Sequence, residues 1–266
     1  MLEQWFQNPR ILGTAQAVVA ILLAMAVVLL ARRRKIYLER ETFVALIRGL
    51  VQVVAVGSVL LLLLQGPLWT AVPALLAMIL AAATIAARRA EGIPGAFWVS
   101  LVGIGFGAGF VILVMTLLGA IEASLSSLIP VGSMLIANAM NSNALALDRF
   151  RGEVTAHTGQ IEAALALGAA PQATVTPYVQ AAVQASLIPR IDSLRSLGIV
   201  WIPGLMAGMV LSGEDPVYAA IYQFVVIAMI FAASGLTSLV ATLLIRSRAF
   251  SPAQQLILRP GPGRGA

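Results

Sequence analysis

Uncharged polar and sulfur-bearing side chains within the apolar stretch 124–147 are the first candidates for chemistry. Met134, Asn138 and Asn141 recur at helical spacing, so they share one face of a helix, and Met140 lies close by. A side-chain amide is costly in a bilayer unless it pairs with a neighbouring helix or lines a wet cavity. Asparagine also joins packed helices. Two interpretations therefore stay open, a pathway lined with weak oxygen ligands and simple helix packing.

A proline–glycine pair, Pro203 and Gly204, interrupts another apolar stretch. Proline removes a helical hydrogen bond and glycine relaxes the backbone, so the pattern predicts a kink or a break. Gly204 and Gly208 form a G-x-x-x-G pair, which permits close helix packing. The kink could also bend during alternating access. This stretch also contains two methionines, Met206 and Met209. Their thioether side chains could fill packing gaps or face a pathway.

Several kinds of chemistry are excluded by residue counts. The chain has no cysteine, so thiolate zinc sites, Fe–S clusters and disulfides are excluded. Its one histidine, His157, cannot form a histidine cage within one chain. A P-loop needs a lysine after a glycine-rich turn, and the only lysine, Lys35, lies in an arginine run instead. Hydrolysis of ATP-Mg would therefore occur in a separate chain, and we expect no cofactor in this one.

The composition indicates that these residues are positioned by membrane helices. Of 266 residues, 60% are hydrophobic and 11% are charged, whereas soluble domains carry about 25% charged residues. A helix needs about 20 mainly apolar residues to cross a bilayer. The predicted fold is an all-α polytopic bundle of about seven spans, at 11–31, 43–65, 68–87, 96–119, 124–147, 195–213 and 217–245.

The distribution of charge predicts the orientation of these spans. If the spans alternate, 16 of the 17 basic residues lie on one side and only Arg10 on the other. The opposite connectors carry the acidic residues Glu122, Glu214 and Asp215. The positive-inside rule then places the C-terminus in the cytoplasm and the N-terminus outside. We expect a protein of the bacterial inner (plasma) membrane that contacts lipid, and the net charge of +6 does not indicate nucleic-acid binding.

Outside the spans, the sequence leaves little material for a second domain. We expect one transmembrane domain over 1–266, with a cytoplasmic segment at 148–194 and a flexible cytoplasmic tail at 247–266. Neither piece is long enough for a catalytic domain with its own core, so we expect no enzyme activity. The cytoplasmic segment contains a short helix-forming stretch that should lie in a partner's groove, at the membrane interface or on its own chain. This stretch includes Glu162, Ala163, Ala164, Leu167, Gly168 and Ala169.

Motifs from about residue 40 to 245 carry a resemblance to a known family. They are Arg48 with Gln52; Ala137 to Met140; Glu162 with Leu167 to Ala169; Ile188, Pro189 and Asp192; Gly198 to Met206; and Pro216, Ala219, Tyr222 and Gln223. In this order they resemble the ABC transporter permeases that include the bacterial iron-export permease FetB and plant aluminium-tolerance permeases.

The resemblance implies a homodimeric permease that exports a metal ion such as iron. It also implies that the helix around Glu162 docks onto a separate ATPase subunit, as an EAA-type coupling loop does. It marks Asn138 and Met140 as pathway residues. Arg48 could bind lipid headgroups, or it could pair with Asp192 or Glu162 and so hold the coupling segment.

Two alternatives stay open on chemical grounds. Hard cations prefer carboxylate oxygens, and no Asp or Glu is assigned to the middle of a span, so a chelated metal or a small organic anion is a second cargo class. An ATP-independent secondary transporter or channel would usually show charged residues within its spans. None is evident here away from the span edges. A membrane scaffold that recruits a partner through 148–194 is a further possibility.

Overall fold

The computed structural model of the chain describes residues 9–35, 37, 39–90 and 92–258, and this part is almost entirely helical. Two isolated bridges, Leu197 with Trp201 and Phe250 with Leu256, are the β pairings found in it. The chain divides into two units, one ending at Gly66 and one beginning at Pro67. The predicted all-α class is therefore confirmed.

The first unit is a helical hairpin of α2 (Pro9–Arg32) and α3 (Glu39–Leu64), which pack against each other. Arg32 and Glu39 form an ion pair across the turn, with Nε and Oε1 3.2 Å apart. Within this unit many apolar side chains are exposed, including Leu23 (69% exposed) and Val53 (72% exposed). Such a hairpin is suited to lipid or protein contact on every side.

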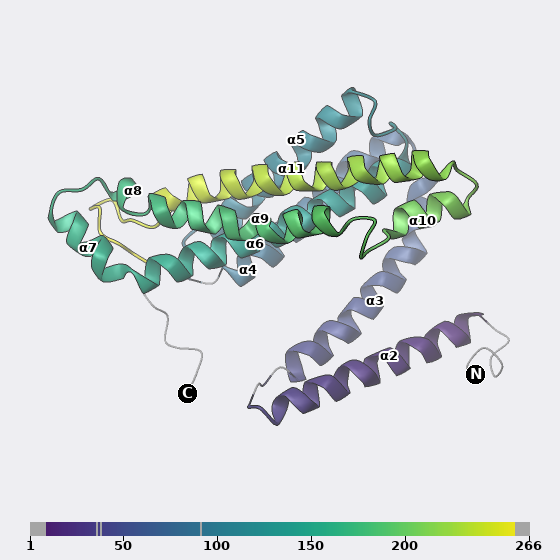
Figure 1. Ribbon diagram of the computed structural model, residues 1–266, viewed down its shortest axis with the longest axis horizontal. Helices are drawn as coiled ribbons and strands as arrows, with labels where there is room; N and C mark the ends of the chain where they lie inside the picture. The colour runs from purple at the N-terminus through teal and green to yellow at the C-terminus, as the bar shows by residue number, and fades with distance from the viewer. Residues whose placement is uncertain (1–8, 36, 38, 91, 259–266) are drawn as a thin grey trace. The chain divides into compact units, whose positions relative to one another are not determined.

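The second unit is a helix bundle (Figure 1). The long helices α5, α6 and α11 pack on one another, with α4 against α5 and α6 and with α9 against α6 and α11. Their bounds are η1 (Leu68–Thr70), α4 (Ala71–Arg89), α5 (Ala96–Leu117), α6 (Leu125–Ala156), α9 (Thr176–Ser196) and α11 (Pro216–Arg248).

Short helices close the two ends of this bundle. At one end lie α7 (Thr158–Ala166) and α8 (Pro171–Thr174), and at the other lies α10 (Gly204–Leu211), as Figure 1 shows. We call these the α7 end and the α10 end. Helix α6 runs from the α10 end to the α7 end, α9 runs back, and α11 returns to the α7 end.

Small and polar residues bring the long helices together. A Cβ added at Gly107 of α5 would lie 2.6 Å from the backbone nitrogen of Thr237 on α11, so glycine is required for this close approach. On α9, Ser186 donates a hydrogen bond of 2.9 Å to Ser238 of α11. On α6, Asn143 donates one of 2.8 Å to Ser100 of α5. These bonds satisfy polar groups that would otherwise be buried at a cost.

In the described part of the chain, five helical segments are long and apolar enough to cross a membrane: Ile11–Arg32, Glu39–Val59, Leu68–Arg89, Ala96–Leu117 and Pro216–Arg248. Residues 125–147 of the predicted span at 124–147 lie within α6. The predicted span at 195–213 is not one continuous helix, because α9 ends at Ser196 and 197–203 are not helical before α10 begins. The break predicted at Pro203 and Gly204 is therefore confirmed. Gly198 has a φ of 75°, and Pro203 precedes the first residue of α10.

Residues 176–194, which the sequence analysis assigned to a long cytoplasmic connector, form most of α9 and pack along the bundle. The small residues Ala182 and Ser186, one turn apart, are both buried, so this face of α9 lies close to its neighbours. The hydropathy of α9 is lowered by three charged residues near its end, Arg190, Asp192 and Arg195. Hydropathy alone therefore does not predict this helix as an apolar segment.

The tail also differs from the expectation of a flexible segment from residue 247. Helix α11 continues to Arg248, and residues 249–258 fold back, with Ile257 N donating to Ala249 O over 2.8 Å. Leu256 and Leu258 are 8% and 2% exposed and belong to the apolar cluster that includes Ile161 of α7. Burial of these leucines holds this part of the tail against the α7 end, and 259–266 lie outside the described residues.

Candidate functional site

A cavity of about 250 Å³ lies between α6, α9 and α11. It is lined by Met134 and Asn138 of α6, Arg190 and Ser193 of α9, Trp201, and Ile227 and Ile230 of α11. It therefore brings two of the predicted pathway residues, Met134 and Asn138, beside a charged residue that the sequence analysis did not place there.

Arg190 and Asn138 are joined directly within this cavity. Arg190 donates a hydrogen bond from Nη1 to Oδ1 of Asn138, and the amide nitrogen of Asn138 donates to the backbone oxygen of Met134 over 2.7 Å. The Nε of Arg190 is buried without a hydrogen-bond partner among the described residues, and none of the ion pairs found there includes Arg190. The arginine thus carries an uncompensated positive charge in this part of the chain.

The position along the helices shows how deep this charge lies. Ile227 and Ile230 are 11 and 14 residues after Pro216, or about 17 and 21 Å along a helix that rises 1.5 Å per residue. Between Pro216 and Arg246, α11 has no charged residue. The cavity thus lies beside the middle of the uncharged part of α11. Asn138 lies 13 residues after the start of α6 and 18 residues before its end.

The bundle therefore holds a charged residue, Arg190, beside the uncharged middle of α11. Arg190 belongs to the stretch 148–194, which was expected to be a cytoplasmic connector. The useful signal was the spacing of Ala182, Ser186 and Arg190, which repeats every four residues and puts all three on one helix face. Ala182 and Ser186 on that face are buried against the bundle, and Arg190, one turn further along the same face, lines the cavity.

The other predicted pathway residues lie elsewhere. Asn141 is exposed, and Met140 packs against the apolar core. The backbone nitrogen of Met206 donates a bond of 3.3 Å to Oε1 of the motif residue Gln223, which is 1% exposed, and this bond attaches α10 to α11. Met209 borders a second hollow, of about 530 Å³, at the α10 end, together with the motif residue Tyr222.

That second hollow has an acidic, oxygen-rich lining. It includes Glu122, Glu214, Ser126, Ser127 and Tyr218. No group of three or more His, Asp or Glu side chains that could hold a metal ion is found in the described part of the chain. The carboxylates of Glu122 and Glu214 give the α10 end of the bundle a negative charge.

Arg48 and Gln52 belong to the first unit, where they lie in a shallow groove along α3 with Phe43, Val44, Ile47 and Val51. Asp192 is close to Arg195 on its own helix, with Oδ1 and Nη1 3.8 Å apart and both side chains exposed. Pairing of Arg48 with Asp192 or Glu162 stays a prediction.

The predicted coupling residues form a compact helical corner at the α7 end. Ile161 anchors α7, since only 1% of it is exposed, and it packs with Val154 and Leu258. Gly168 follows the helix with a φ of 86°, and Ala169 N donates to Ala164 O over 3.0 Å, which closes the helix end. Glu162, Ala163, Leu167, Gly168 and Ala169 are exposed, while Ala164 is half-buried.

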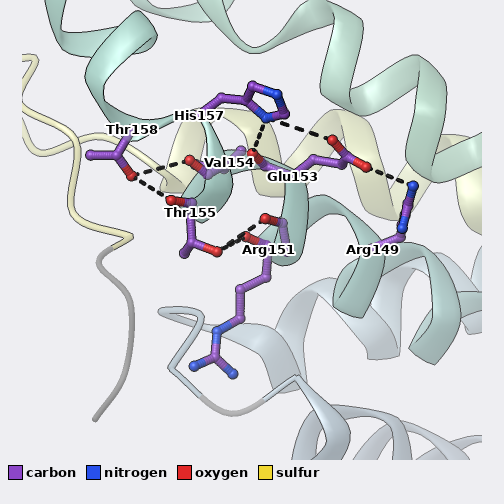
Figure 2. A network of polar contacts seen from close by, with 8 residues as sticks. Arg149, Arg151, Glu153, Val154, Thr155, His157 and Thr158 are labelled. Atoms are coloured by element: carbon purple, nitrogen blue, oxygen red, sulfur yellow. Dashed lines mark hydrogen bonds and ion pairs between the residues drawn. The ribbon is translucent and has the colours of Figure 1, made fainter. Parts of the chain in front are cut away.

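A polar network fixes the joint between α6 and α7 (Figure 2). Glu153 Oε1 pairs with Arg149 Nη2 at 2.7 Å, and the backbone oxygen of Glu153 lies 2.9 Å from Nδ1 of His157. The ring of His157 stacks on Tyr178 of α9, with ring centres 4.9 Å apart. Thr158 donates to Thr155 O over 3.0 Å. His157 therefore links α6, α7 and the start of α9.

Comparison with known proteins places the chain in a family. The profile described as "Uncharacterised protein family (UPF0014)" matches residues 14–250. The chain is 30% identical over 240 residues, 90% of its own length and 93% of the relative's, to the "Probable iron export permease protein FetB" of Escherichia coli (strain K12). It is 28% identical over 246 residues to the "Protein ALUMINUM SENSITIVE 3" of Arabidopsis thaliana, covering 92% and 90% of the two chains.

A third relative is the "UPF0014 membrane protein YjkA" of Bacillus subtilis (strain 168), 29% identical over 229 residues and covering 85% and 91% of the two chains. No solved structure matches the chain. The profile match covers most of the chain and agrees with the resemblance inferred from its motifs. The chain therefore belongs to the UPF0014 family.

Proposed function

We propose that this chain is the membrane-spanning permease subunit of an ABC transporter that exports a metal ion, with iron as the first candidate. A separate ATPase subunit would bind and hydrolyse ATP-Mg, and the permease would act as a homodimer. The main support is the likeness over most of both chains to a relative named as a probable iron export permease. The anchored and outwardly apolar corner at the α7 end gives such a partner a place to bind.

The proposed topology has seven membrane segments. Five are the long apolar helices, the sixth is α6, and the seventh is the interrupted segment made by α9 and α10. The basic residues Arg149, Arg246 and Arg248 lie at the α7 end, so the positive-inside rule puts that end in the cytoplasm of a bacterial cell. The C-terminus is then cytoplasmic and the N-terminus outside. The cytoplasmic connector shortens to about 157–175, because α9 belongs to the bundle.

Coupling would proceed through α7. Closure of the ATPase dimer would push on the exposed face of α7, and Ile161 and the His157 network would transmit this displacement to α6 and α9. These two helices border the cavity that holds Asn138 and Arg190. Movement at the α7 end could therefore change access to the cavity.

The test is co-purification of this chain with a candidate ABC ATPase, followed by ATPase assays in lipid nanodiscs. We expect a stable complex whose hydrolysis rate rises with ferrous or ferric iron. A stable complex whose hydrolysis rate does not change with iron would support the permease role and reject iron as the cargo. Failure to bind any ABC ATPase would reject the permease role.

Arg190 favours one alternative, an ATP-independent secondary transporter, because charged residues within a bundle often couple transport to ions. Proteoliposomes that contain this chain alone separate the two functions. Uptake driven by a proton or ion gradient without ATP would establish the alternative. Dependence on the ATPase and on ATP would support the proposal above.

A further inference from the structure

The cavity between α6, α9 and α11 has the donor set of an anion site. Its polar lining consists of the Arg190 guanidinium, the Trp201 indole, the Asn138 amide and the Ser193 hydroxyl, and no carboxylate lines it. The Ser193 hydroxyl donates to Pro189 O over 2.8 Å, so the donors of the site are the guanidinium and the indole. Arginine and tryptophan side chains donate hydrogen bonds and accept none. A bare cation entering this space would meet a positive charge and few free acceptors.

The one strong acceptor in the cavity is already occupied. Oδ1 of Asn138 accepts from Arg190, and its amide nitrogen is held by Met134 O. The asparagine oxygen, which could have been a weak metal ligand, therefore orients the guanidinium instead. Asn138 acts here as a positioning residue for Arg190, since its side chain is fixed by the turn of α6 that precedes it.

The guanidinium in turn is only partly satisfied. Its Nε is buried without a partner, and the ion pairs found among the described residues leave it out. A charge beside the uncharged middle of α11 is costly unless something compensates it. A guanidinium presents a planar fork that matches the two oxygens of a carboxylate or phosphate. The missing partner is thus an oxyanion that enters from outside this part of the chain.

We propose that Arg190 binds a carboxylate or phosphate group of the transported ligand, so that cargo crosses the membrane in anionic form. The cavity of about 250 Å³ has room for roughly eight waters at about 30 Å³ each, which suits a small organic acid or phosphate. A metal would then travel as an anionic chelate, with its positive charge covered by the ligand. This inference rests on the proposed transport role, whose cargo class it narrows.

The test measures binding by the full chain in phosphatidylcholine nanodiscs, without any ATPase. The probes are radiolabelled citrate, citrate loaded with ferric iron, inorganic phosphate and ferrous iron alone. We expect at least one anionic probe to bind, and Arg190→Gln to weaken it by roughly tenfold or more, since a charge-assisted hydrogen bond is lost. Arg190→Lys should retain part of the affinity, because it keeps the charge but not the fork.

Arg195→Gln is the matched control. It makes the same change of charge on the same helix, but Arg195 is exposed and lies close to Asp192. Equal loss in both variants would overturn the proposal, as would binding of ferrous iron alone with no binding of any anion. Citrate binding that requires iron identifies a chelate, and binding without iron identifies a free acid. Both outcomes support an oxyanion site.

A second measurement needs no variant, in case Arg190→Gln does not fold. Phenylglyoxal modifies accessible arginines, and mass spectrometry locates the product. We expect bound anion to protect Arg190 in the wild-type chain and to leave Arg195 reactive. An Arg190 that is unreactive before anion is added already has a partner, and the proposal would then be wrong. Anion binding with failed ATPase coupling would reject only the proposed ABC role.

Discussion

The contact between α5 and α11 gives a sharp prediction about stability. A Cβ placed on Gly107 would lie 2.6 Å from Thr237 N and 2.8 Å from Ala233 O. Both are backbone atoms, so rotation of a side chain cannot relieve the clash. Gly107→Ala should therefore force the two helices apart. Overpacking of this kind costs about 1–3 kcal/mol, and helix propensity returns about 0.5–1 kcal/mol, which leaves a net loss of up to about 2.5 kcal/mol.

Gly109→Ala is the control on the same helix. Apart from the backbone of its own helix and its chain neighbours, nothing in the described part of the chain lies within 4 Å of the Cβ that would be added there, so this variant should match the wild type or be more stable by up to about 1 kcal/mol. The measurement is unfolding of the purified chain in mixed micelles by increasing SDS, followed by tryptophan fluorescence. Coincident unfolding midpoints for the two variants would refute the close approach of α5 and α11.

Three further predictions use pairs of variants. Leu167→Glu (the leucine is 89% exposed) should abolish co-purification with the ATPase, while Leu211→Glu, equally exposed (88%) at the α10 end, should not; equal binding by both would reject docking at α7. Asn143→Ala removes the 2.8 Å bond to Ser100 and should cost about 1–3 kcal/mol in the same SDS assay, whereas Asn141→Ala, at an exposed position, should have little effect. Leu258→Ala should speed hydrogen exchange in α7 because it removes a buried side chain; Ile257→Ala (the isoleucine is 45% exposed) should not, and equal rates would contradict the packed tail.

The apolar segments were predictable because hydropathy alone determines them. Composition gave the helical class, and the run from 217 to 245 lies within α11. Helix α9 was missed for the opposite reason. Its buried face is made of small residues such as Ala182 and Ser186, which contribute little hydropathy, and three charged residues follow them.

The same limit applies to the candidate site. Met134 and Asn138 were found because an amide in an apolar stretch is conspicuous, and the structure places both at one cavity. Arg190 could not be placed from its neighbours in sequence, since its depth depends on where α9 packs. The fold of the tail depends on contacts of Leu256 and Leu258 with residues distant in sequence, including Ile161, and the glycine and proline content of the tail does not reveal them.

The α2–α3 hairpin has a consequence for biosynthesis. In the windows of both helices that could span a membrane, no residue is buried within the structure, so the hairpin has no core of its own to assemble. Its apolar side chains must be covered by lipid or by protein from outside the hairpin, while each helix satisfies its own backbone hydrogen bonds. The hairpin leaves the ribosome before every helix that follows Pro67. It can therefore enter the bilayer before the bundle is translated.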